Sequence, residues 1–121
     1  MSALEELQSL AKSSKNNNYV GEYALKQILD FLKQQGSTEE YQEALDLIYR
    51  LIKLREEDFS KRNASIILEE YSNIELLLDL LDHEDLTVGV MTSQIMTELH
   101  ANDGAQLEAL IQKCPDGNEI N

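Results

Sequence analysis

The chain has 121 residues, which suits one compact domain that buries about two-thirds of its unfolded surface. Its net charge of -13 repels phosphate backbones and anionic lipid headgroups, which argues against nucleic-acid binding and direct membrane insertion. A single cysteine excludes an internal disulfide, and no apolar run approaches the roughly 20 residues that span a bilayer. We therefore expect a soluble, intracellular single domain over residues 1–121.

The first third of the chain predicts two helices. Ser2 and Glu5 have the spacing of a capping box, and the helix that they begin ends near Ser13. The polar stretch 13–18 predicts a loop, and a second helix covers residues 19–35. Gly36 follows it and suits the left-handed conformation that often ends a helix.

A third helix begins with the capping-box pair Ser37 and Glu40 and extends to about Arg55. Its apolar residues fall on one face at helical spacing: Tyr41, Ala44, Leu45, Ile48, Leu51 and Ile52. Residues 55–63 are charged and have no apolar period, so we expect a loop insertion there.

The second half of the chain predicts four more helical segments. Residues 64–71 suggest a short helix, and Ser72 with Glu75 repeats the capping-box spacing before a leucine-rich helix that stops near His83. A further apolar stripe begins at Leu86 and ends within 102–104. The last helix stops near Pro115 and carries Leu107, Leu110 and Ile111.

Two helices recur in the same order along the chain. Leu25, Ile28, Leu29 and Leu32 have the spacing of Ile74, Leu77, Leu78 and Leu81, at a shift of 49 residues. The stripe of the third helix recurs from Val88 at a shift of 47. Repeats of about 40 to 47 residues are typical of armadillo and HEAT proteins, so we predict an all-α, right-handed α-solenoid of about two and a half repeats. An ordinary helical bundle stays open as the alternative.

The solenoid interpretation has two consequences. The leucine-rich helix should touch neighbours on several sides, so Leu78→Ala is predicted to cost roughly 2 to 5 kcal/mol. The last repeat is cut short and lacks a polar capping helix, which predicts either a fragment of a longer array or a homodimer that pairs through the uncapped C-terminal end.

No pattern in the chain indicates catalysis, a metal site or a cofactor. His83 and His100 lie at separate helix ends without a ligand partner at metal-binding spacing, and we expect both to interact with carbonyl groups. Cys114 stands beside Pro115 with no base at hand. We therefore predict that the protein is not an enzyme. A small enzyme or metal protein in a helical bundle is the competing class, and it requires polar residues that converge in a cavity.

A solenoid usually binds partners along the exposed strip of its third helices. The first strip contains Lys26, Gln27, Asp30 and Lys33, and the second contains Asn73, Glu75, Asp79 and Asp82. The second strip is acidic and suits a basic partner segment. The alternative, that these charges only keep the surface solvated, stays open.

The order of segments resembles a known family. "LEELQSLAKSS", "YALKQILDFL", "YQEALDLIYRLIK" and "NIELLLDLLDHEDLTV" together resemble the armadillo-repeat head of the Golgi vesicle-tethering factors, also called general vesicular transport factors. The resemblance covers nearly the whole chain. The family's head is several times longer, and its coiled coil and acidic tail are absent here.

The resemblance implies a non-catalytic scaffold for ER-Golgi transport. Such a protein is cytoplasmic and peripheral on Golgi or transport-vesicle membranes, binds Rab-type small GTPases or other tethering components, and forms a homodimer. No residue-level site carries over, because the resemblance lies in leucines of core type. A second binding interpretation is an armadillo adaptor of another kind, such as the GTPase-binding region of formins.

Overall fold

The computed structural model describes Ser9 and residues 18–34, 36–53 and 57–113, and most of these residues are helical. The helices are α2 (Asn18–Leu32), α3 (Thr38–Ile52), α4 (Glu57–Ile67), α5 (Tyr71–Leu81) and α6 (Leu86–Lys113). The described ranges contain no strand, and the all-α prediction is confirmed. The helix and loop predicted for residues 2–18 fall almost wholly outside the described residues.

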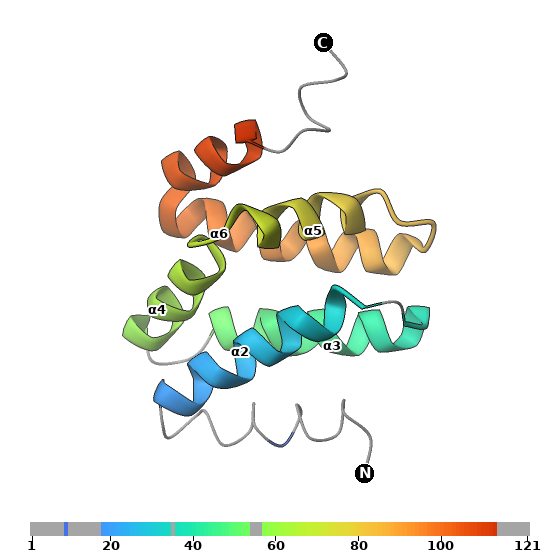
Figure 1. Cartoon of the computed structure of the whole chain (residues 1–121), viewed down its shortest axis with the longest axis horizontal. Coiled ribbons are helices and arrows are strands. Elements are labelled where there is room, and N and C mark those ends of the chain that lie inside the picture. Colours follow the sequence, from blue (N-terminus) through green and yellow to red (C-terminus); the bar gives the residue numbers. More distant parts are fainter. Residues whose placement is uncertain (1–8, 10–17, 35, 54–56, 114–121) are drawn as a thin grey trace.

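The helices form two antiparallel pairs that lie on each other (Figure 1). Helix α2 packs against α3, and α5 packs against α6. The pairs meet where α3 contacts α6, and α2 runs in the same direction as α5 in the picture. Helix α4 stands beside both pairs and contacts α2, α3 and α6, with an ion pair from Arg62 to Glu22 of α2. Helices α3 and α6 therefore join the two pairs, while α2 packs on α3 and α5 packs on α6.

The core is a continuous layer of leucine and isoleucine contributed by all five helices. Leu25, Ile48, Ile74, Leu77 and Ile95 are among its fully buried members. On α5, however, Leu76 and Leu78 are only partly buried and Leu81 is 39% exposed. The expected enclosure of this helix on several sides was therefore wrong, because α5 packs mainly on α6.

Helix α3 begins as the sequence predicted. Ser37 Oγ accepts from the Glu40 amide at 3.1 Å, and Glu40 Oε1 accepts from the Ser37 amide at 3.0 Å, so both bonds of the capping box form. The helix ends at Ile52, before Arg55. The capping box predicted at Ser72 does not form, because α5 already begins at Tyr71 after Glu70, whose side chain makes no cap bond.

Two other boundary predictions need correction. The expected loop at 55–63 is wrong from Glu57 onward, where α4 begins with Glu57 and Asp58 in its first turn. Acidic side chains there interact favourably with the positive end of the helix dipole. A search for apolar periods does not detect a helix start of this kind. Gly36 has no positive φ, because α2 ends at Leu32, too early for Gly36 to be its terminal residue. Instead its amide donates to Tyr41 Oη at 3.3 Å.

Helix α6 is interrupted where the sequence predicted a helix end. Asp103 has non-helical angles, with φ -158° and ψ 80°. Its Oδ1 accepts from the amide of Gln106 at 3.1 Å, which starts the last helical segment in the manner of an N-cap. The separate helix that carries Leu107, Leu110 and Ile111 is thereby confirmed.

Buried amide side chains satisfy the ends of two helices. The last carbonyls of a helix have no partner within that helix. Asn63 Nδ2 donates to the carbonyl of Leu51 in α3 at 2.9 Å, and Asn73 Nδ2 donates to the carbonyl of Ile67 in α4 at 3.2 Å. Each asparagine therefore ties its helix to the end of the preceding one.

Asn63→Ala is expected to destabilise the protein by about 1 to 3 kcal/mol, because it leaves the buried Leu51 carbonyl without a donor. Asn63 and Leu51 are each 1% exposed, so water cannot readily replace the lost bond. Urea denaturation followed by circular dichroism measures the change. Ser65→Ala on the exposed side of the same helix is the control, with an expected change within about 0.5 kcal/mol. Equal effects of the two substitutions would contradict the assigned role.

Candidate functional site

The strip predicted on α2 is on the surface. Lys26, Asp30 and Lys33 are exposed and Gln27 is half-buried. Their spacing of four and three residues keeps the three charged side chains on one face of α2. Tyr23, 53% exposed, precedes Lys26 by three residues and extends the same face. Sequence reasoning missed this tyrosine, although its helical spacing from Lys26 was available.

The strip predicted on α5 is only partly on the surface. Asp79 and Asp82 are exposed, and Glu75 is half-buried. Asn73 was expected on this strip, but it is 4% exposed because its amide serves the end of α4. Tyr71, 51% exposed, takes a place on this face four residues before Glu75.

Lys33 connects the two strips. Its Nζ donates to Ser72 Oγ at 3.5 Å, and Ser72 Oγ donates to Glu70 Oε2 at 3.4 Å. A lysine directly after α2 therefore reaches the first turn of α5, although 39 residues separate Lys33 from Ser72. Each of the two helices also has an exposed tyrosine, Tyr23 on α2 and Tyr71 on α5.

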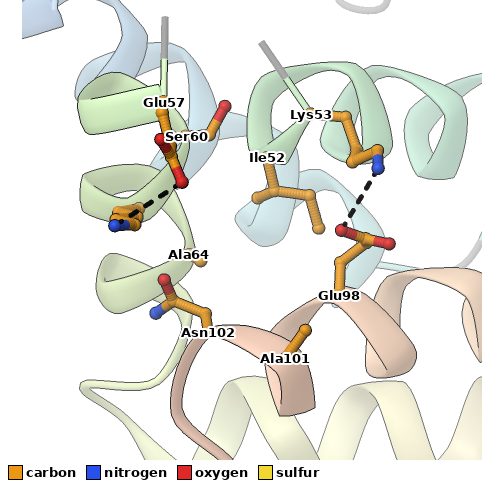
Figure 2. Close-up of a pocket in the computed structure, with 9 residues that line it drawn as sticks. Ile52, Lys53, Glu57, Ser60, Ala64, Glu98, Ala101 and Asn102 are labelled. Carbon is orange, nitrogen blue, oxygen red and sulfur yellow. Dashed lines mark ion pairs between the residues drawn. The ribbon is translucent and has the colours of Figure 1, made fainter.

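A cleft of about 440 Å³ lies between the end of α3, helix α4 and helix α6 (Figure 2). Lys53 Nζ is 3.5 Å from Glu98 Oε1, and Lys61 Nζ is 3.6 Å from Glu57 Oε1. Both lysines therefore have a carboxylate neighbour within the cleft. Its described lining includes no histidine or cysteine, the side chains most suited to acid-base or nucleophilic chemistry near neutral pH.

A polar junction joins α3 to the start of α6. Asp85 Oδ2 accepts from the Val88 amide at 2.9 Å and from Gln42 Nε2 of α3 at 3.0 Å. His83 Nδ1 accepts from the Asp85 amide at 3.0 Å, and its ring stands edge-on to Tyr41 with centroids 5.6 Å apart. The bond to Val88, followed by that to Gln42, lowers the pKa of Asp85 from its ordinary 3.8. His83 therefore accepts an amide hydrogen bond instead of contacting a carbonyl, and it serves the junction.

Asp85→Asn is expected to lower stability at pH 7 and to have a smaller effect in acid. Because the folded-state pKa of Asp85 is depressed, its contribution is present above the unfolded value of 3.8 and is lost as the pH falls through the folded value. Urea midpoints of both proteins at pH 7 and pH 2.5 test this. A difference that stays constant over this range would contradict it. The control is Asp46→Asn, at a half-buried aspartate of α3.

The described residues include no cluster of three or more histidine, cysteine, aspartate or glutamate side chains placed to hold a metal ion. None of their helices has the length and apolar character needed to cross a membrane. His100 lies 3.8 Å from Glu108, an exposed pair within α6. Cys114 falls outside the described residues.

Comparison with known proteins gives no relative from which to transfer a site. The chain matches no protein-family model and no curated protein sequence.

Proposed function

We propose that the protein is a non-catalytic protein-interaction scaffold related to vesicle tethering in ER-Golgi transport. We further propose that its helices form an armadillo/HEAT-like, right-handed α-solenoid of about two and a half repeats. The observation that carries the proposal is the packing of the α2–α3 pair on the α5–α6 pair through α3 and α6. The proposal is supported by the apolar spacings of α2 and α3, which recur in α5 and α6 at shifts of 49 and 47 residues.

The exposed faces of α2 and α5 favour a protein partner. Tyr23 and Tyr71 are each about half exposed, and tyrosine is enriched in protein interfaces because its ring combines apolar area with a polar hydroxyl. Four charged side chains on these helices or directly after them are exposed and can fix the orientation of the partner: Lys26, Lys33, Asp79 and Asp82. The resemblance to the tethering family suggests a Rab-type small GTPase or another tethering component, met on the cytoplasmic side of Golgi or transport-vesicle membranes.

The proposal is tested by measuring the binding of the whole chain to a panel of Rab GTPases, each loaded with GTP or GDP. We expect one member to bind in its GTP form, and Tyr71→Ala with Asp79→Lys to weaken that binding. Asp58→Lys on the exposed start of α4 is a control for the change of charge. Failure of every GTP-loaded Rab to bind would overturn the link to tethering. Binding that the α5 variant leaves unchanged would move the interface away from α5.

A further inference from the structure

The turn between α5 and α6 exposes apolar side chains that the strips do not include. Leu81, Leu86 and Val90 are 39%, 80% and 48% exposed, and we call them the hairpin patch. Among the described residues, five large hydrophobic side chains are exposed, and three of them form this patch. Much of the exposed apolar surface of the described residues is therefore concentrated at the end of the α5–α6 pair where the turn lies.

The three residues lie close together on the backbone. Leu86 and Val90 are one turn apart on α6 and share a face. A Cβ atom on Gly89 would lie 3.2 Å from the carbonyl oxygen of Leu81, so the end of α5 sits directly against the turn of α6 that carries the patch. Glycine suits this approach, since a Cβ atom at position 89 would make a tight contact with the Leu81 carbonyl.

The patch belongs to the half of the chain that holds most of the negative charge. Residues 63–112 contain ten aspartate and glutamate residues and no lysine or arginine, so they carry -10 of the net -13. Asp82 and Glu84 are exposed in the turn itself, between Leu81 and Leu86 in sequence. An apolar patch with an acidic border and no basic residue in its own segment is complementary to apolar side chains flanked by lysine or arginine.

We infer that the hairpin patch binds a basic amphipathic segment of a partner protein. Apolar side chains of that segment cover Leu86 and Val90, while its lysines or arginines lie beside Asp82 and Glu84. A second copy of the chain is the less suitable occupant, because it would bring two segments of charge -10 together. Nucleic acid and anionic membranes have the wrong sign of charge. The inference rests on the proposed interaction function only in assuming a protein partner, and it requires no Rab.

The test uses two helical peptides of about five turns. Both have leucine on one face, and the other face has lysine in one peptide and glutamate in the other. Fluorescence anisotropy with the whole chain should show binding of the lysine peptide about tenfold or more tighter than that of the glutamate peptide. Raising the salt to about 0.3 M should weaken the binding, because the partner charges are exposed.

Variants locate the binding site. Leu86→Ser and the pair Asp82→Lys with Glu84→Lys should each weaken the lysine peptide about tenfold. The matched controls are Ala109→Ser, at an exposed position near the end of α6, and the pair Asp58→Lys with Glu108→Lys, which changes the charge equally at remote positions. Both controls should bind like the unchanged chain. Circular dichroism checks that each variant folds. Leu86→Ser should fold normally, because Leu86 is 80% exposed.

Three results would overturn the inference. The first is equal affinity for the lysine and glutamate peptides. The second is undiminished binding by both hairpin variants. The third is a dimer, seen by light scattering, that Leu86→Ser dissociates, because the patch would then belong to a second copy of the chain. None of these results bears on GTP-dependent Rab binding, so failure here is distinguishable from failure of the proposed function.

Discussion

Leu77→Ala is expected to lower the free energy of unfolding by about 2 to 5 kcal/mol. Leu77 is fully buried in the core, so alanine leaves a cavity as well as removing apolar contacts. Leu78, the neighbouring leucine, is only partly buried, and its replacement should cost less than that of Leu77. Urea denaturation followed by far-UV circular dichroism compares the two.

Leu86→Ala is the control for this series, because Leu86 is 80% exposed and its loss should change stability by no more than about 0.5 kcal/mol. The expected order of cost is Leu77, then Leu78, then Leu86. If Leu78→Ala costs more than Leu77→Ala, the face by which α5 packs on α6 has been assigned incorrectly.

Ile48→Asp should abolish folding of the chain. Ile48 is fully buried on α3, the helix that joins the two pairs by packing on α6. A carboxylate there has to be buried without a charged partner or accept a proton, and either change costs several kcal/mol. That cost is comparable to the roughly 5 to 15 kcal/mol that stabilises a typical domain.

The measurement is the helical signal of the variant at 25 °C, with Asp46→Asn on the same helix as its control. Asp46 forms an exposed ion pair with Arg50 at 2.9 Å, and such pairs contribute little, so this variant should fold normally. A folded Ile48→Asp protein with a cooperative urea transition would show that water reaches position 48.

Local patterns predicted the parts of the fold that depend on local interactions. The capping box at Ser37 and Glu40 and the break near Asp103 are set by residues close in sequence, and both were found where the sequence placed them. The apolar stripe of α3 also corresponds to buried residues, because one face of a surface helix must meet the core. Helix α4 was partly missed because its first seven residues have no apolar period.

The candidate sites were less predictable, because they depend on contacts between distant residues. Asn73 is polar, so the sequence suggests an exposed position. Its burial is explained only by its hydrogen bond to the Ile67 carbonyl. The bond between Gln42 and Asp85 joins residues 43 positions apart, and no local pattern indicates it. The hairpin patch was overlooked because its leucines were counted as core, whereas exposure depends on which helices cover α5 and α6.

The arrangement of stacked pairs is tested most directly by measuring the stability of a chain with one added repeat. A second copy of residues 36–82, inserted after Asp82, places another α3, α4 and α5 before α6. The insertion keeps the sequence period, since Gly36 and His83 are related by the shift of 47.

In a solenoid the added unit stacks on the existing pairs and contributes its own interface, so the free energy of unfolding should rise while the transition stays cooperative. A closed helical bundle has no free face for it. Lower stability than the original chain, or a separate early transition of the insert, would contradict the solenoid and with it the scaffold function that we propose.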